Sequence, residues 1–85
     1  MKVVRDPRFI RDFAGLPASI QERAEKKLAL FLQNPRHPSL QTHKMEGGRE
    51  IWEGRITEDY RFTFRIVGDL YQLRRIGTHD IYKSP

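Results

Sequence analysis

The chain has 85 residues, 38% of them hydrophobic and 11% aromatic, which suffices for one small domain over residues 1–85 and excludes a second. With 16 Lys and Arg against 11 Asp and Glu, the net charge of +5 favours a polyanionic partner such as nucleic acid, although solubility alone also accounts for it. The sequence has no cysteine, no apolar run of the roughly 20 residues that span a bilayer and no signal-peptide pattern, so we expect a cytoplasmic protein with no membrane partner and no thiolate metal site.

The N-terminal region predicts a short strand and a first helix. Residues 2–4 (KVV) are β-branched at two positions, which favours a strand. Asp6 can cap a helix and Pro7 suits its first turn, and apolar residues then follow helical spacing up to Gly15. We therefore predict a helix that begins at Pro7 and stops at Gly15.

A second helix is predicted after Leu16-Pro17 and before Asn34. Apolar side chains recur there every three or four residues, and charged side chains lie outside that stripe. Ser19 and Glu22 have the spacing of a capping box, which would start the helix. The two helices together indicate a helical hairpin.

The C-terminal half predicts three strands after a long irregular connection. Residues 34–49 contain two prolines and the pair Gly47-Gly48, which indicate irregular structure. Tight turns, of which Gly68-Asp69 has good hairpin chemistry, then separate strands over residues 50–57, 60–67 and 70–77. The order predicts an α+β fold: an N-terminal strand, a helical hairpin, and then a three-stranded antiparallel meander packed on the helices.

Alternation along the middle strand separates rings from arginines. One face carries Tyr60, Phe62, Phe64 and Ile66. The other face carries Arg61, Thr63, Arg65 and Val67. Because successive side chains of a strand point to opposite faces, we expect the aromatic face to be buried under the helices and the arginine face to be left to solvent or to a ligand.

Arginines of the neighbouring strands join this face in the prediction. Arg55 is expected on the same face, and alternation places Arg74 and Arg75 on opposite faces, so that one of them is added. Guanidinium groups suit phosphate oxygens, and like charges on adjacent strands repel unless an anion lies between them. The alternative is a solvated face whose counter-ions are Glu53, Glu58 and Asp59.

Two further side chains follow the last predicted strand, in GTHDIYKSP. His79 can transfer a proton near neutral pH, and Tyr82 can stack on a base. Taken singly, each residue has a structural alternative. His79 could be a loop histidine that binds a backbone group, and Tyr82 could be an aromatic ring that closes a small core. A zinc site is not expected, because His37 and His43 lie six residues apart in an irregular segment without cysteine.

The order of these motifs resembles the RelE/ParE toxin superfamily, on its RelE-type, mRNA-cleaving side, over nearly the whole chain. LPASIQERAEKKLALFLQNP is similar to the helical hairpin of the family, and HKMEGG to its His-x-Leu-x-Gly turn, with Met45 in place of leucine. WEGRITEDYRFTFRI is similar to the central hairpin of YoeB-like and RelE-like members. RRIGTHDIY is similar to the closing strand of YafQ-like and YoeB-like members.

The resemblance implies catalytic roles for Arg61, Arg55, His79, Tyr82 and His43. Arg61 matches the arginine that holds the scissile phosphate, and Arg55 matches a basic residue earlier in the hairpin. His79 falls where relatives have a catalytic histidine or arginine, and Tyr82 matches a tyrosine that stacks on a base or assists catalysis. His43 matches a histidine that some YafQ-like members use.

The resemblance leaves the general base open. The glutamate that YoeB-like members use falls near Pro38 or Ser39, neither of which can accept a proton in its place. The lysine pair of RelE-like members is reduced to Arg55. His43 and Glu58 remain as alternatives for the base.

The function implied is that of a toxin of a type II toxin–antitoxin pair, a metal-independent endoribonuclease without a cofactor. The ribose 2′-OH would attack the adjacent phosphorus while arginines stabilise the developing charge and His79 protonates the leaving 5′-oxygen. The expected partners are mRNA in the ribosomal A site and a cognate antitoxin protein. The alternatives are a ParE-like toxin that inhibits gyrase and a non-catalytic relative that binds nucleic acid.

Overall fold

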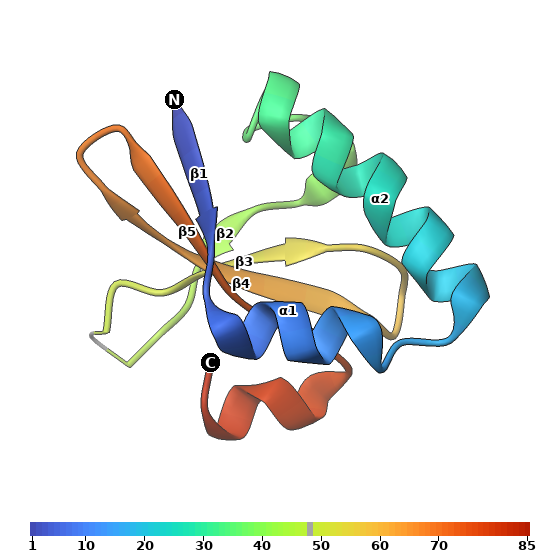
Figure 1. Ribbon diagram of the computed structural model, residues 1–85. Helices are drawn as coiled ribbons and strands as arrows, with labels where there is room; N and C mark the ends of the chain where they lie inside the picture. Colours follow the sequence, from blue (N-terminus) through green and yellow to red (C-terminus); the bar gives the residue numbers. More distant parts are fainter. Residues whose placement is uncertain (48) are drawn as a thin grey trace.

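A five-stranded sheet in the order β1-β5-β4-β3-β2 organises the computed structural model, which describes residues 1–47 and 49–85 (Figure 1). The strands are β1 (Lys2–Arg5), β2 (His43–Lys44), β3 (Trp52–Arg55), β4 (Arg61–Val67) and β5 (Leu70–Gly77). The helices are α1 (Pro7–Ala14) and α2 (Ala18–Gln33), with 3₁₀ turns η1 (Pro38–Leu40) and η2 (His79–Lys83). The predicted α+β order of strand, two helices and antiparallel meander is confirmed.

The two helices begin in different ways. As predicted, Asp6 caps α1: its carboxylate accepts a hydrogen bond from the backbone N–H of Arg8 at 2.8 Å. The capping box predicted for α2 is wrong, because Pro17 is the N-cap and no side chain caps the helix. The carbonyl of Pro17 accepts the first backbone hydrogen bonds, so Ser19 already lies inside the helical turn.

Two strand pairings were not predicted. The segment 34–49, expected to be irregular, contains η1 and the two-residue strand β2, which pairs antiparallel with β3. Two residues are too few for an alternating pattern to stand out. β1 pairs in parallel with β5, which joins the start of the chain to its end. Of the predicted Gly47-Gly48 pair, Gly48 lies outside the described residues.

A register shift interrupts the pairing of β4 with β5. Thr63 lies opposite Arg75, but Phe64 lies opposite Leu73, so Arg74 has no opposite residue. The strict alternation that placed Arg74 and Arg75 on opposite faces is therefore wrong at this point. Both side chains lie outside the core.

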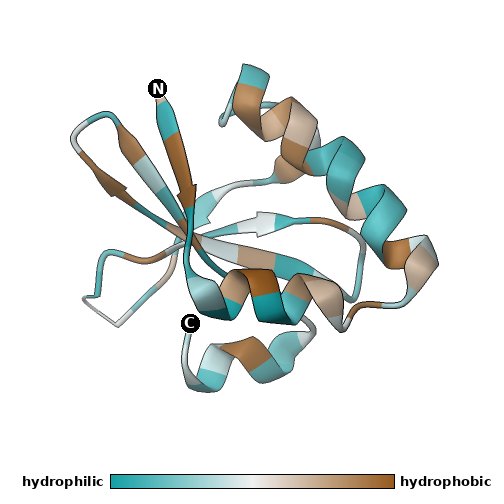
Figure 2. Ribbon diagram, in the orientation of Figure 1, coloured by the Kyte–Doolittle hydropathy of each residue, from teal (hydrophilic) through white to brown (hydrophobic). Residues whose placement is uncertain are grey.

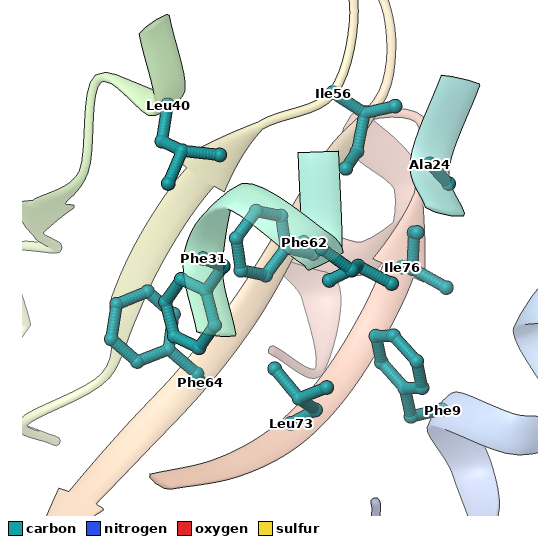
Figure 3. Close-up of a cluster of buried hydrophobic side chains, with 10 residues drawn as sticks. Phe9, Ala24, Phe31, Leu40, Ile56, Phe62, Phe64, Leu73 and Ile76 are labelled. Atoms are coloured by element: carbon teal, nitrogen blue, oxygen red, sulfur yellow. The ribbon is translucent and has the colours of Figure 1, made fainter. Parts of the chain in front are cut away.

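Phe31 of α2 stands at the centre of the core (Figure 3). Its ring makes edge-to-face contacts with Phe62, Phe64 and Tyr71 at centroid distances of 5.3, 4.8 and 5.7 Å. Such pairs contribute about 0.5–1.5 kcal/mol each beyond their buried area. The predicted burial of the aromatic face is confirmed for the phenylalanines, whereas Ile66, near the end of β4, is 37% exposed.

The two helices cover different parts of the sheet. α2 buries Ala24, Leu28 and Phe31, while its middle turns are largely hydrophilic (Figure 2). α1 continues from β1, which pairs with β5 only as far as Leu73. Beyond that point the Asp12 carboxylate of α1 accepts the backbone N–H of Ile76 at 3.2 Å, and so satisfies a donor on β5 that no strand reaches.

Gly54 of β3 provides a test of the packing between sheet and core. A Cβ at this position would overlap the ring of Phe62, which is fully buried. We expect Gly54→Ala to lower the free energy of unfolding by about 1–3 kcal/mol, measured by urea denaturation followed by circular dichroism. Gly15→Ala is the matched control, because its Cβ would meet its nearest atoms at 3.6 and 3.8 Å. Equal stability of the two variants would contradict this packing.

Candidate functional site

The outward face of the sheet is partly covered by the C-terminal segment. Thr63, on that face, is fully buried, and Ile81 of η2 is 3% exposed. Arg74 and Arg75 donate hydrogen bonds to the backbone carbonyls of Pro85 and Ser84 at 3.0 and 3.1 Å. The prediction that this face is left to solvent or ligand is therefore wrong over part of its area. Gly77 of β5 lets η2 pack closely, because a Cβ there would lie 3.0 Å from the Ile81 side chain.

A buried carboxylate, that of Glu53, lies at the edge of this covered area. β2 and β3 place His43 directly opposite it, with His43 Nε2 3.3 Å from Glu53 Oε1. The Glu53 side chain is 8% exposed, and within the described part of the chain its Oε2 is buried without a hydrogen-bond partner. Because burying a carboxylate is costly unless it is paired, this arrangement requires the cationic groups around it.

Both ring nitrogens of His43 contact hydrogen-bond acceptors. Its Nδ1 lies 3.2 Å from the carbonyl oxygen of Gln41, which can only accept a hydrogen bond. Its Nε2 faces the Glu53 carboxylate, which also accepts. A neutral imidazole can donate to only one of these two acceptors, whereas an imidazolium can donate to both.

Tyr82 of η2 reaches the same carboxylate from the C-terminal segment. Burial raises the pKa of the Tyr82 phenol above its usual value, and the neighbouring Glu53 carboxylate raises it further. The Arg61 guanidinium acts in the opposite direction on this pKa. Tyr82 is therefore a protonated hydroxyl at neutral pH, positioned between an acceptor and a cation.

Arg61 and Arg55 face each other across β3 and β4. Arg61 donates to the backbone carbonyls of Thr57 and Tyr60 in the β3–β4 turn, which hold its guanidinium. Arg55 donates to Oε1 of Gln41 at 3.4 Å. Side chains directly opposite on antiparallel strands have Cβ atoms about 4.5–5.5 Å apart, so the two cations repel unless an anion binds between them.

Gln41 contacts both Arg55 and His43. Its side chain accepts from Arg55, and its carbonyl oxygen contacts His43. Its φ of 47° lies in the left-handed region, which is uncommon for a residue other than glycine. This turn directs the short strand β2 past β3 so that His43 meets Glu53.

A groove of about 410 Å³ opens beside these groups. Its lining consists of His43, Lys44, Met45, Glu46, Glu53 and Tyr82. The groove is large enough for part of a nucleotide, and it offers charged groups together with an aromatic ring. We call His43, Glu53, Arg61 and Tyr82 the Glu53 cluster.

The other arginines of the sheet have separate roles. Arg75 forms a bidentate ion pair with Asp12, at 2.6 and 3.2 Å, which joins β5 to α1. Arg65, Arg74 and Arg49, with Glu50 and Ile51, line a second groove of about 420 Å³. Burial lowers the pKa of Arg74, and the positive charges of Arg8, Arg65 and Arg49 lower it further. The Asp6 carboxylate acts in the opposite direction. The predicted single arginine face is therefore divided.

The predicted site residues are placed as follows. His43, Arg61 and Tyr82 meet around Glu53, and Arg55 lies next to Arg61. His79 is the first residue of η2, and its side chain is 85% exposed. Its Nε2 lies 3.9 Å from Asp80 Oδ1. Across residues 1–47 and 49–85, no hydrogen bond or ion pair joins His79 to the Glu53 cluster.

Sequence reasoning missed Glu53 and Gln41 as site residues. The sequence analysis treats Glu53 only as a solvated counter-ion of the arginines, although its place on the same face as several cations is a usable signal. Gln41 carries no sequence signal of its own, because its role comes from its backbone conformation.

The described residues include neither a cluster of metal ligands nor a membrane-spanning helix. Between residues 1 and 47 and from 49 to 85, no group of three His, Cys, Asp or Glu side chains could hold a metal ion. His37 instead accepts a hydrogen bond from the backbone N–H of Ser39 at 3.2 Å, as the N-cap of η1. Neither described helix is long and apolar enough to cross a bilayer.

Several solved toxin structures share this arrangement of helices and strands. A YoeB/ParE toxin from Agrobacterium tumefaciens matches with a TM-score of 0.76 and 20% identity, over 93% of this chain and 99% of that chain. YafQ from E. coli matches with a TM-score of 0.79 and 13% identity, over 95% and 96% of the two chains. This chain has the RelE/YoeB/YafQ-like toxin fold.

A third RelE-like structure was solved together with its antitoxin. The RelB–RelE antitoxin–toxin complex from Methanococcus jannaschii matches with a TM-score of 0.75 and 22% identity, over 96% of this chain and 99% of that chain. No protein-family model matches the chain, and no curated protein matches its sequence. The resemblance noted from the sequence is thus confirmed at the level of the fold.

The raised pKa of Tyr82 can be measured and traced to its cause. We expect the phenol to titrate above the usual value of about 10, and Glu53→Gln to lower its pKa because a negative neighbour is removed. NMR of ¹³C-labelled tyrosine follows the titration, and Tyr82→Phe identifies the resonance. An unchanged or higher pKa in Glu53→Gln would contradict the contact.

This shift also has a consequence for stability. The folded protein holds the Tyr82 proton more tightly than the unfolded chain does. Its contribution to stability is therefore present below the unfolded pKa of about 10 and is lost as the pH rises from there through the folded pKa.

Proposed function

We propose that this protein is the toxin of a type II toxin–antitoxin pair and that it acts as a metal-independent endoribonuclease on mRNA in the ribosomal A site. The observation that carries the proposal is the Glu53 cluster. Side chains from β2, β4 and η2, to which the family resemblance gives catalytic roles, meet beside one groove in this chain. The fold it shares with solved toxins supports the same reading.

Arg61 and Arg55 would bind the scissile phosphate. Their guanidinium groups are opposite each other and lack a carboxylate partner among the described ion pairs. A phosphodiester between them relieves their repulsion, and the additional charge of the transition state is stabilised still more. The products of 2′-OH attack are a 2′,3′-cyclic phosphate and a free 5′-OH.

His79 and Tyr82 would act from the C-terminal segment. They are three positions apart in η2, with Tyr82 beside the Glu53 cluster and His79 exposed. An exposed imidazole side chain can reach a bound substrate and serve as the general acid for the leaving 5′-oxygen. The Tyr82 ring lines the groove and offers a surface on which a base can stack.

The proposed partners are mRNA on the ribosome and an antitoxin protein. RelE of M. jannaschii and YafQ of E. coli were each solved in complex with an antitoxin, RelB and DinJ respectively. The groove of Arg49, Arg65 and Arg74 would contact the nucleic-acid backbone away from the scissile phosphate. Action on ribosomes places the protein in the cytoplasm.

The first experiment removes Arg61. We expect Arg61→Ala to lower the rate of mRNA cleavage on programmed ribosomes by about 10²–10³-fold, the usual effect of losing one donor to a developing charge. Arg23→Ala is the control, because it removes the same charge from an exposed position of α2 and should cleave like the parent.

Induction in cells separates the possible functions. Growth arrest with discrete mRNA ends in primer extension, both lost in Arg61→Ala, is the expected result. Growth arrest with DNA damage and intact mRNA would indicate a gyrase inhibitor instead. Unimpaired growth with retained, salt-dependent RNA binding would indicate a non-catalytic relative.

The second groove predicts a different phenotype. Arg65→Gln combined with Arg74→Gln should weaken RNA binding and flatten its dependence on salt concentration by about one unit of logarithmic slope per lost phosphate contact. The maximal cleavage rate should stay near that of the parent, because neither side chain belongs to the Glu53 cluster. Fluorescence anisotropy over a range of KCl concentrations measures the slope. An unchanged slope would remove this groove from the RNA-binding surface.

A further inference from the structure

The C-terminal segment holds two side chains of the proposed mechanism, but burial does not fix their direction. Tyr82 is 42% exposed, and the His79 side chain is 85% exposed. Ile81 lies between them in η2 and is buried, with its side chain close to Gly77 of β5. Because apolar burial is non-directional, this single anchor allows η2 to turn about it. Additional contacts are needed to orient Tyr82 and His79.

Ser84 provides polar contacts at the other end of η2. Its backbone N–H donates to the carbonyl of Ile81 at 3.1 Å and closes the turn. Its own carbonyl accepts a hydrogen bond from Arg75 Nη1 at 3.1 Å, and its hydroxyl accepts one from Arg8 Nη1 at 3.2 Å. Because hydrogen bonds are directional, these contacts fix the chain two residues after Tyr82.

Arg75 is the better fixed of these two arginines. The Asp12 carboxylate of α1 accepts from its Nε at 2.6 Å and from its Nη2 at 3.2 Å, which leaves Nη1 for Ser84. The same carboxylate accepts the backbone N–H of Ile76, the next residue on β5. The side chain of Arg75 is 22% exposed, against 37% for Arg8. The planar guanidinium of Arg75 is therefore fixed relative to both β5 and α1.

Arg74 also contacts the C-terminal segment, but at a less effective place. It donates to the carbonyl of Pro85 at 3.0 Å, beyond the turn that Ser84 closes. No carboxylate forms an ion pair with Arg74 within the described part of the chain, and its side chain lines the second groove. Arg75 is thus the arginine whose own position and whose contact with η2 are both fixed.

We propose that Arg75, fixed by Asp12, is a positioning residue that holds the Ser84 carbonyl. Through η2 this contact sets where Tyr82 and His79 lie relative to the groove. The assignment rests on the proposed ribonuclease function. Neither Arg75 nor Asp12 lines the groove beside Tyr82, so both act through η2 and not on the substrate.

The kinetic test replaces Arg75 by lysine, which keeps the positive charge. Lysine has one nitrogen and cannot reproduce the planar fork that binds Asp12 and Ser84 together. On programmed ribosomes we expect Arg75→Lys to lower kcat by about 10–100-fold, because a displacement of roughly 1 Å in catalytic groups can cost about 10²-fold. KM should stay near the parental value, because the arginines proposed to bind phosphate are unchanged.

A spectroscopic measurement follows the position of Tyr82 without any substrate. In the parent, burial and the Glu53 carboxylate raise the pKa of the Tyr82 phenol. In Arg75→Lys we expect this pKa to fall toward the ordinary value of about 10, because the ring is no longer held there. NMR of ¹³C-labelled tyrosine measures the titration. An unchanged pKa would show that η2 keeps its place without Arg75 and would overturn the proposal.

Further variants control for folding and for the choice of arginine. Asp12→Asn keeps an acceptor for the backbone N–H of Ile76 but weakens the hold on Arg75, so kcat and the Tyr82 pKa should change in the same direction. Arg23→Lys makes the same exchange on an exposed position of α2 and should match the parent. Thermal unfolding of each variant verifies that the fold is retained.

Ser84→Ala tests the weaker contact. It removes the hydroxyl that Arg8 binds and keeps the carbonyl that Arg75 binds, so the loss in kcat should be smaller than in Arg75→Lys. A larger loss in Ser84→Ala would place the anchor at Arg8 and overturn the role of Arg75.

The remaining outcomes separate this assignment from the proposed function. If the parent cleaves mRNA and Arg75→Lys cleaves like it, or changes KM alone, the positioning role is overturned and the ribonuclease function stands. If the parent leaves mRNA intact, the ribonuclease function fails. The catalytic meaning of Arg75 then fails with it, even where NMR shows that Arg75 places Tyr82.

Discussion

A carboxylate that is buried away from solvent must be surrounded by hydrogen-bond donors and cations. This requirement organises the outward side of the sheet. Glu53 is 6% exposed, and the groups that compensate it come from parts of the chain that are distant in sequence. His43 approaches from β2 and Arg61 from β4, while Tyr82 comes from the C-terminal segment. Breaking any one of these contacts leaves buried charge less well compensated, so the cluster holds these elements together.

The core on the other side of the sheet makes that cluster possible. Phe31 packs against Phe62 and Phe64, which fixes α2 over β4 and leaves the outward face for other groups. Gly54 lets the Phe62 ring lie directly against β3, and Glu53 next to it then points away from the helices. A single strand thus presents an apolar surface to the core and a carboxylate to the groove.

The arginines of this small protein illustrate how position decides the role of one side-chain type. Arg75 is neutralised by Asp12 and joins β5 to α1. Arg61 is held by backbone carbonyls, which orient a guanidinium without cancelling its charge. Burial and the neighbouring cations lower the pKa of Arg74, and the carbonyl of Pro85 orients its side chain. A charge that remains uncompensated at a groove is the feature that suits an anionic ligand.

The sequence by itself determined the order of elements and the buried phenylalanines, and its family motifs named Arg61, Tyr82 and His43 as candidate site residues. These follow from periodicity, turn residues and family motifs, which are local properties of the chain. The tertiary structure alone decided that Glu53 is buried, that the arginines separate into groups and that Arg74 falls at a register shift. Burial and strand register depend on which distant segments pack together, and a local pattern cannot encode that information.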